Sequence, residues 1–301
     1  MTLLIYARGG GIGHVNRAFA IAQVLQNRHG ISPLLLATSP LIPYEILANA
    51  QVMRWPWQDE TLISEHMAPF IRRLAPQALL VDTFEQGPEG ELASLELPRW
   101  VIQRDGEVPL SSRHFLVKPQ GVGYVLNTAP QAVASRTVAR DYWQADPARG
   151  PLVVVAHNGD PQETRSFFEG VSNLLSGTDY QVRFASLLPC LKPVWREQWC
   201  SPYPLAQWYA GVDLLIGGGG YNLVAEAQCY GVRGLFYGFE RPVDQQWDRI
   251  ASLPHFHWGM EKTLFLARVQ EVLLAPPPRP ESHCQGAEKI AQILAEHLQK
   301  A

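Results

Sequence analysis

The chain has 301 residues, of which 47% are hydrophobic, enough for two ordinary domains that each bury a core. The formal net charge is −3 and no basic run stands out, so composition gives little support to nucleic-acid binding. No apolar stretch reaches the roughly 18 residues that a membrane-spanning helix needs.

The cysteines and the first residues indicate a cytoplasmic protein. The four cysteines form no CxxC pair and have no zinc-like spacing, which is typical of free thiols in a reducing compartment. The N-terminus lacks the charged region and the cleavage site of a signal peptide. We therefore expect a cytoplasmic location.

A glycine-rich turn, GGGIGHVNR over residues 9–17, is the first candidate site. It lies between a predicted buried strand at residues 3–6 and a predicted amphipathic helix. Gly11 and Gly13 allow a ligand to approach the backbone closely, and the helix N-terminus offers unpaired N–H groups and a positive dipole end. His14 falls in the first helical turn, where neutral imidazole, suited to a general base, is favoured. A strand, turn and helix that bind nothing are the alternative.

The rest of the first half alternates between strand and helix patterns. Such alternation predicts a parallel sheet with helices on both faces. The predicted strands are residues 31–37, 52–55, 78–81, 99–103 and part of 116–127, and the predicted helices are residues 40–50, 61–74 and 89–95.

Charged residues follow two of these strands. Asp82 and Glu85 come after the strand that ends at residue 81, and Arg104 and Asp105 come after the strand that ends at residue 103. Ligands bind at the carboxyl ends of parallel strands. With His14, these residues therefore indicate a cleft, although Asp82 could equally cap a turn and the Arg-Asp pair could be only a turn.

A polar stretch at residues 139–150 separates two similar halves. We predict one domain over residues 1–145 and a second over residues 146–301, with the last helix, 286–300, a candidate to pack on the first domain. In the second half the predicted strands are residues 151–156, 181–186, 212–216 and 233–237, and a helix is predicted at residues 163–175.

Four successive glycines, Gly217–Gly220, are the densest signal in the second half. They cost backbone entropy on folding, and a site that needs bare backbone near an anion explains them better than a flexible linker does. Glu226 lies about 1.5 turns into the following helix, where a carboxylate can accept the two hydroxyls of a ribose. Gln245 and Gln246 carry amides, which both donate to and accept from sugar hydroxyls.

Nothing in the sequence indicates a metal or a resident cofactor. No Asp-x-Asp motif is present, so we expect no obligatory metal. His255 and His257 share one face of a possible strand, but no third ligand is close in sequence. Placement in the core or on the surface explains the two histidines better than metal binding.

The stretch Ala206–Ile250 resembles the nucleotide-sugar half of GT-B glycosyltransferases. It is most similar to the branch that contains the enzyme transferring N-acetylglucosamine to lipid I, and GGGIGHVNRAFAIAQVL resembles the N-terminal loop of that branch. The resemblance implies an α/β fold with two Rossmann-like domains whose parallel sheets face each other across a cleft. It also implies transfer of a sugar from a nucleotide-diphosphate sugar, in our expectation a UDP sugar, to an acceptor hydroxyl.

The resemblance also implies that residues 1–145 are the acceptor-side domain and residues 146–301 the nucleotide-sugar domain, and it assigns roles to residues. It implies that Glu226 holds the ribose, that Gln245 and Gln246 read the sugar hydroxyls, and that the backbone near Leu205 meets the base. The loop at residues 157–161 departs from the family's Gly-Gly-Ser form. The implied catalytic residue is His14, and the predicted donor-binding residues are Gly11, Gly13, Leu205, Gly218, Gly219, Gly220, Tyr221, Asn222, Glu226, Gln245 and Gln246.

Two other functions stay open at this point. The pattern G-x-G-H-V-x-R at residues 11–17 also resembles the nucleotide-sugar hydrolase of the pseudaminic acid pathway, and a nucleotide-sugar-binding protein without catalysis is the non-enzyme alternative. The acceptor is unknown and could be a small molecule, a glycan or a lipid-linked group. Ile63, Met67 and Phe70 fit either a core stripe or a lipid-facing patch, so peripheral membrane contact stays open.

Overall fold

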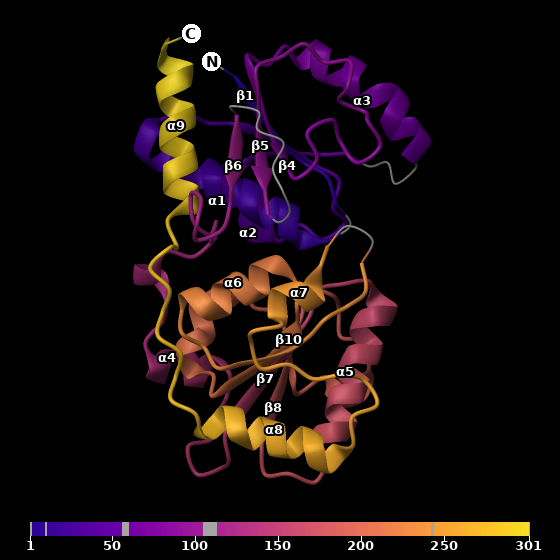
Figure 1. Ribbon diagram of the computed structural model, residues 1–301, viewed down its shortest axis with the longest axis vertical. Helices are drawn as coiled ribbons and strands as arrows, with labels where there is room; N and C mark the ends of the chain where they lie inside the picture. Colours follow the sequence, from indigo (N-terminus) through magenta and orange to yellow (C-terminus); the bar gives the residue numbers. More distant parts are fainter. Residues whose placement is uncertain (1, 10, 56–59, 105–112, 242–243, 301) are drawn as a thin grey trace. The chain divides into compact units, whose positions relative to one another are not determined.

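The structure is a computed structural model that describes residues 2–9, 11–55, 60–104, 113–241 and 244–300 (Figure 1). The chain forms two compact units, one of Met1–Asn127 with His283–Ala301 and one of Thr128–Ser282. The predicted boundary between residues 145 and 146 lies inside the second unit. The helix α4 (Arg136–Tyr142) precedes this point and packs against the 3-10 helix η3 (Leu205–Gly211) of that unit.

The first unit is built on a six-stranded parallel sheet with the order β3-β2-β1-β4-β5-β6. All five residues of β1 and of β4 are buried, as expected for strands covered on both faces. The strands are β1 (Leu3–Ala7), β2 (Leu34–Ala37), β3 (Gln51–Arg54), β4 (Ala78–Asp82), β5 (Arg99–Gln103) and β6 (His114–Leu116), and the helices are α1 (Ile12–His29), α2 (Tyr44–Asn49), α3 (Glu60–Leu74) and α9 (Gly286–Lys300).

The second unit is built on a five-stranded parallel sheet with the order β11-β10-β7-β8-β9. Because both sheets are parallel and flanked by helices, the predicted α/β class is confirmed. The strands are β7 (Leu152–Ala156), β8 (Gln181–Ala185), β9 (Trp199–Cys200), β10 (Leu214–Gly218) and β11 (Gly234–Tyr237), and the helices are α4 (Arg136–Tyr142), α5 (Pro161–Leu175), α6 (Tyr221–Cys229), α7 (Gln246–Ile250) and α8 (Lys262–Leu274), with short 3-10 helices η1 (Pro130–Ala132), η2 (Pro193–Trp195) and η3 (Leu205–Gly211).

The C-terminal helix α9 belongs to the first unit and lies beside α1 (Figure 1). Glu288 of α9 pairs with Arg28 of α1 at 3.6 Å. The ring of His297 lies 4.6 Å from the ring of Trp100 on β5. These contacts attach the end of the chain to the sheet that the N-terminus begins.

Some predicted elements differ from those observed. Residues 89–95 form turns instead of a helix, because Gly87 and Gly90 adopt positive φ angles of +82° and +75° that interrupt helical backbone. In residues 116–127 only the first residue is in a strand, the end of β6. The predicted strand at residues 212–216 is observed as β10, which continues to Gly218. Helices α4 and α8 were not predicted.

The predicted stripe on α3 faces the core of the first unit. Ile63 is 3% exposed and Met67 is fully buried, and both pack in one cluster with residues of β1 and β4. Phe70 packs against the same cluster. These residues therefore form no lipid-facing patch. Across the described residues, no helix combines the length and the apolar character needed to cross a bilayer.

Candidate functional site

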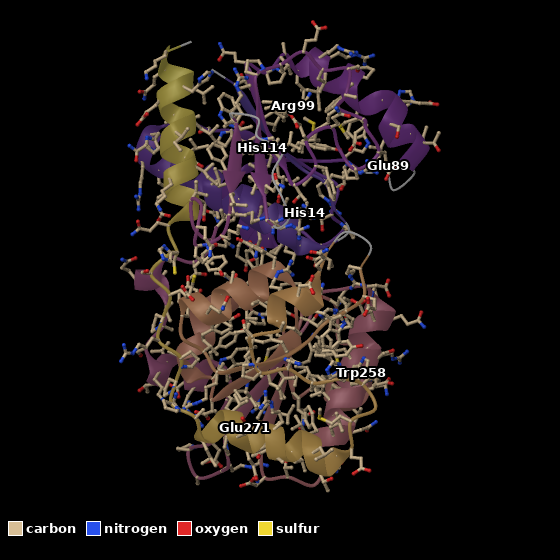
Figure 2. The ribbon with its side chains drawn as sticks, in the orientation of Figure 1. His14, Glu89, Arg99, His114, Trp258 and Glu271 are labelled. Atoms are coloured by element: carbon tan, nitrogen blue, oxygen red, sulfur yellow. The ribbon has the colours of Figure 1, made fainter. Side chains whose placement is uncertain are left out.

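The first site lies where the connections of the first sheet change direction. Strand β1 is hydrogen-bonded to β2 on one side and to β4 on the other, so the chain leaves the carboxyl end of the sheet in opposite directions at this point. Ligands of open parallel sheets bind at such switch points. Two residues come from this edge: His14 (Figure 2), in the first turn of α1, and Asp82, the last residue of β4.

A buried ion pair anchors the site. The guanidinium of Arg17, one turn along α1 from His14, contacts both oxygens of Asp82, with Nη2 at 2.8 Å and Nε at 3.1 Å from Oδ2 and Nη2 at 3.1 Å from Oδ1. Arg17 is 1% exposed and Asp82 is 2% exposed. The hydroxyl of Thr83 also donates to Asp82 Oδ1, at 2.9 Å. Asp82 is therefore held in one orientation by several donors.

The same carboxylate faces the ring of His14. Nδ1 of His14 lies 3.4 Å from Asp82 Oδ2, longer than the usual hydrogen bond between a ring nitrogen and a carboxylate. The opposite edge of the ring lies over Gly9, where an added Cβ would fall 2.3 Å from Cδ2 and 2.8 Å from Nε2. Gly9 therefore makes room for the ring. A carboxylate at Nδ1 favours the tautomer with the proton on Nδ1, which leaves the lone pair of Nε2 available as a base.

Neighbouring charges keep Asp82 ionised, and burial keeps His14 neutral. Burial alone would raise the pKa of Asp82, but the Arg17 guanidinium and the His14 ring outweigh it, so that pKa lies well below its usual range. Burial lowers the pKa of His14, and Asp82 opposes this shift only in part, while Arg17 and Arg104 add to it. A neutral imidazole beside a fixed carboxylate is the arrangement of a general base.

The other charged residues predicted for this edge are placed less closely. Arg104 is near enough to His14 and Asp82 to influence the pKa of both. Glu85 is 3.9 Å from Nε2 of His114 and about half exposed. Asp105 lies outside the described residues.

The second site lies at the equivalent switch point of the second sheet, between β7 and β10. Two of the predicted glycines, Gly217 and Gly218, are strand residues whose missing side chains are explained by packing within the protein. A Cβ on Gly217 would fall 2.3 Å from Leu223, and a Cβ on Gly218 would fall 2.9 Å from His157 and 3.0 Å from Phe239. A Cβ on Gly219 would fall 3.1 Å from a carbon of Ile250.

Gly220 differs from these three glycines. It is the N-cap of α6, without a capping side chain, and an added Cβ would meet nothing within 4 Å. Packing within the protein therefore does not require a glycine at this position. The N–H groups of the first turn of α6 and the positive end of the helix dipole lie next to this open space. The arrangement suits an anion that needs close approach to the backbone.

An arginine that we did not single out in the sequence supports the loop before α6. Arg249 of α7 donates from Nη1 to the carbonyl of Gly219 at 2.8 Å and from Nη2 to Asp244 at 2.6 Å. Its guanidinium carbon lies 5.8 Å from the centre of the Tyr221 ring. The guanidinium therefore links the Gly219 carbonyl to Asp244 and fixes the loop beside the N-terminus of α6.

Glu226 is buried against η3. It is 7% exposed, and its Oε2 accepts a hydrogen bond of 3.2 Å from the hydroxyl of Tyr209. Burial raises the pKa of Glu226 to about 7, and the Tyr209 hydrogen bond opposes that shift. Near neutral pH the carboxyl group is therefore partly protonated, and hydroxyl donors from a ligand would favour its charged form.

This pKa predicts a stability change for Glu226→Gln. Between the ordinary pKa of 4.5 and the folded value of about 7, the folded protein binds more protons than the unfolded chain. Its stability must therefore fall as the pH rises through this window. We expect Glu226→Gln to increase the free energy of unfolding by about 1–3 kcal/mol at pH 8 and to change it little at pH 4. Denaturant unfolding at the two pH values measures the difference.

Glu271→Gln is the control, because Glu271 lies exposed on α8 of the same unit (Figure 2). The free energy of unfolding of Glu271→Gln should change with pH as it does in the wild type. If the free energies of unfolding of Glu226→Gln and the wild type differed by the same amount at every pH, the raised pKa of Glu226 would be contradicted.

Other predicted donor residues belong to the second unit. Gln246 is 6% exposed, and its amide accepts from the backbone of Phe239 at 3.1 Å and donates to Asp244 at 2.9 Å, so it organises the loop. Gln245 is exposed. Leu205 is the first residue of η3, and Tyr221 and Asn222 begin α6.

The histidines predicted as a weak metal candidate have other contacts. Nδ1 of His255 contacts the carbonyl of Leu253 at 2.8 Å, and the ring of His257 stacks on Trp247 at 4.5 Å. Within the described ranges, no three His, Cys, Asp or Glu side chains are grouped to hold a metal ion.

Arg165 is exposed on α5 and pairs with Glu169, so it lies on the helix surface.

Comparison with known proteins identifies the fold. No protein-family model and no curated protein sequence matches this chain. Among solved structures, the kitacinnamycin glycotransferase matches with a TM-score of 0.64 and 10% identity, over 99% of this chain and 98% of its own. S. aureus MnaA in complex with UDP matches with a TM-score of 0.62 and 12% identity, over 99% and 97%.

A third match is MurG from Acinetobacter baumannii, with a TM-score of 0.55 and 14% identity over 100% of both chains. These identities are low, so the matches describe the fold and not the activity. They extend over nearly the whole of each chain, and both parallel sheets are included. The predicted resemblance to GT-B glycosyltransferases is therefore confirmed at the level of the fold.

Proposed function

We propose that the protein is a glycosyltransferase that moves a sugar from a nucleotide-diphosphate sugar to an acceptor hydroxyl. The donor that we propose is a UDP sugar. The observation that carries the proposal is the buried His14–Asp82 pair at the switch point of the first sheet. This pair offers a neutral base whose orientation is fixed by a carboxylate. The fold match, which includes a protein solved with UDP, supports the choice of donor.

In this proposal the second unit binds the donor. The diphosphate contacts the N–H groups at the start of α6, beside Gly220 and the loop that Arg249 fixes. Glu226 accepts hydroxyls of the ribose, and the exposed amide of Gln245 contacts the sugar. The backbone at Leu205 meets the base. Gly11, the N-cap of α1, and Gly13, in its first turn, let the reacting groups approach the backbone near His14.

The reaction follows from these placements. The bond between the anomeric carbon and the diphosphate oxygen breaks, and its electron pair stays on the diphosphate. Helix N–H groups stabilise the charge that builds there. The acceptor oxygen forms the new bond to the anomeric carbon, and its proton moves to Nε2 of His14. We propose that these groups suffice without an obligatory metal, so EDTA should leave the rate unchanged.

The test is a binding screen combined with a release assay. UDP, TDP, GDP, ADP and CDP sugars are added to the protein, and thermal stability and free nucleoside diphosphate are both measured. A donor at 100 times its dissociation constant adds roughly 2.7 kcal/mol of stability. Stabilisation with little release in water supports transfer. Rapid release in water alone would contradict transfer and indicate hydrolysis, and no stabilisation by any donor would contradict the proposal.

Gly220→Ala sharpens the same experiment. Because a Cβ at Gly220 meets nothing in the protein, we expect the free energy of unfolding to change by less than about 1 kcal/mol. The new methyl group occupies the proposed diphosphate position, so donor affinity should fall at least about tenfold. Ser135→Ala is the control, because it removes the side-chain cap of α4 in the same unit. It should lower the stability of the unit and leave donor affinity unchanged. Donor affinity that survives Gly220→Ala would contradict the proposed position.

A further inference from the structure

A hollow in the second unit lies at the edge of the sheet opposite to the proposed donor site. Its volume is about 420 Å³, which is within the range of small-molecule sites. It is formed where the chain enters β7, β10 and β11 and where α8 ends, and α6 and α8 lie at opposite ends of the unit (Figure 1). Its lining includes Arg140, Arg149, Asp213, Arg233, Leu273 and Leu274. Because β7 has five residues, the length of the strand separates the hollow from the donor site by roughly 13 Å.

The carboxylate in this lining, Asp213, is already held by two arginines. Its Oδ1 lies 2.6 Å from Nη2 of Arg136, and its Oδ2 lies 2.9 Å from Nη1 of Arg140. Oδ2 also accepts a hydrogen bond of 2.8 Å from the backbone N–H of Leu152. Burial would raise the pKa of Asp213, but these hydrogen bonds outweigh it and lower that pKa. Asp213 is therefore charged, and it has no capacity left to balance the other arginines of the hollow.

Two further arginines of the lining have no carboxylate partner among the described residues. Arg233 donates from Nε to the carbonyl of Ala275 at 2.9 Å, which fixes its side chain against the end of α8. In the described part of the chain, Nη1 and Nη2 of Arg233 and the whole guanidinium of Arg149 make no hydrogen bond. Burial lowers the pKa of Arg183, and the charge of Arg149 lowers that pKa further. Arg149 therefore carries a positive charge that its neighbours do not neutralise.

The hollow has an excess of positive charge beside an apolar wall. A second carboxylate, Asp179, lies next to the lining, because an added Cβ on Gly150 would fall 2.8 Å from its Oδ2. Asp179 and Asp213 together balance only part of the charge of the four arginines. Leu273 and Leu274 end α8 on the apolar side, and Leu274 is 86% exposed. Guanidinium groups bind phosphate through paired N–H donors, so the lining suits a phosphate joined to an apolar or organic group.

We propose that this hollow is a second anion site, in which Arg149 and Arg233 bind the phosphate group of a phosphorylated compound and the two leucines contact the rest of that compound. The phosphate can belong to a soluble molecule or to a lipid, since the recognition chemistry is the same. The ligand is bound and not converted, because the site lies at the other end of the strands from the proposed reaction. The inference therefore does not depend on the proposed function.

The test titrates the protein with inorganic pyrophosphate in a calorimeter. Gly220→Ala serves as the parent protein, because it blocks the proposed diphosphate position at α6 and leaves the hollow intact. In this parent, Arg149→Gln and Arg233→Gln should each weaken pyrophosphate about 10- to 100-fold, as expected for the loss of charge-assisted hydrogen bonds. Arg268→Gln is the matched control, because Arg268 lies on α8 but pairs with Glu271 at 2.5 Å. It should bind pyrophosphate as the parent does.

Vesicle flotation distinguishes the two sources of the phosphate. The probes are vesicles of phosphatidylcholine with and without phosphatidic acid. If the ligand is a lipid, the parent should float only with phosphatidic acid, and both Arg233→Gln and Leu274→Ser should reduce the floating fraction. If the ligand is a soluble phosphate compound, pyrophosphate should bind and neither kind of vesicle should carry the protein.

The inference fails if the parent binds neither pyrophosphate nor phosphatidic acid vesicles. It fails equally if Arg149→Gln and Arg233→Gln bind both probes as well as Arg268→Gln does. Circular dichroism checks that each variant is folded, and Arg149→Gln decides if Arg233→Gln does not fold. UDP binding by the otherwise unchanged protein tests the proposed function separately, and Arg149→Gln should leave that binding within about twofold of the wild type.

Discussion

His14→Ala is expected to reduce sugar transfer by a factor of about 10²–10⁴ while donor affinity stays close to that of the wild type. The loss is large because the imidazole is the group that removes the acceptor proton, and Asp82 is already committed to Arg17. Donor affinity persists because the proposed donor contacts lie in the second unit. Transfer rates at saturating donor, together with calorimetric titration of the nucleoside diphosphate, measure the two quantities separately.

His66→Ala is the control for this change. His66 lies on α3 of the same unit with about half of its side chain exposed, next to Glu65. Its removal should leave both transfer and binding unchanged. A His14→Ala protein that transfers sugar at the wild-type rate would contradict the assignment of the base. One that loses donor affinity by the same factor as the rate would assign His14 to binding instead.

The first site could be predicted only in part from the sequence. His14 was identified because a histidine at the start of a helix after a glycine-rich turn has few structural explanations. Asp82 fitted a turn cap equally well, since one charged residue after a strand does not show which strand lies beside it. Its importance comes from the pairing of β1 with β4, which joins residues 65 positions apart through Arg17 and Asp82.

The glycine-rich loop of the second unit shows a different limit. The sequence correctly indicated a strand, glycines and a helix, but four glycines cannot be told apart without their neighbours. Gly217, Gly218 and Gly219 face side chains of the same unit, whereas Gly220 faces open space. The contacts of Arg249 were also missed, because they join loops that follow different strands.

Asp82→Asn is expected to destabilise the protein by about 3–5 kcal/mol, because it leaves the buried charge of Arg17 without a counter-charge. Arg17 is 1% exposed, so water cannot replace the lost carboxylate. The double variant Arg17→Leu with Asp82→Leu removes both charges and should recover most of this loss. Chemical unfolding of the wild type and the two variants measures the difference. A double variant as unstable as Asp82→Asn would show that packing, and not the unpaired charge, is responsible.

The pH dependence of the same comparison tests the ionisation of Asp82. Its folded pKa lies below the unfolded value of about 3.9, so the unfolded chain binds the proton first as the pH falls. The stabilisation is therefore complete above that unfolded value and is lost progressively below it. The wild type should lose stability steeply from pH 4 downward, and Asp82→Asn should lack this component. The same carboxylate faces Nδ1 of His14. Acid that protonates Asp82 would therefore remove the charge that orients the His14 ring at the same time as it weakens the fold.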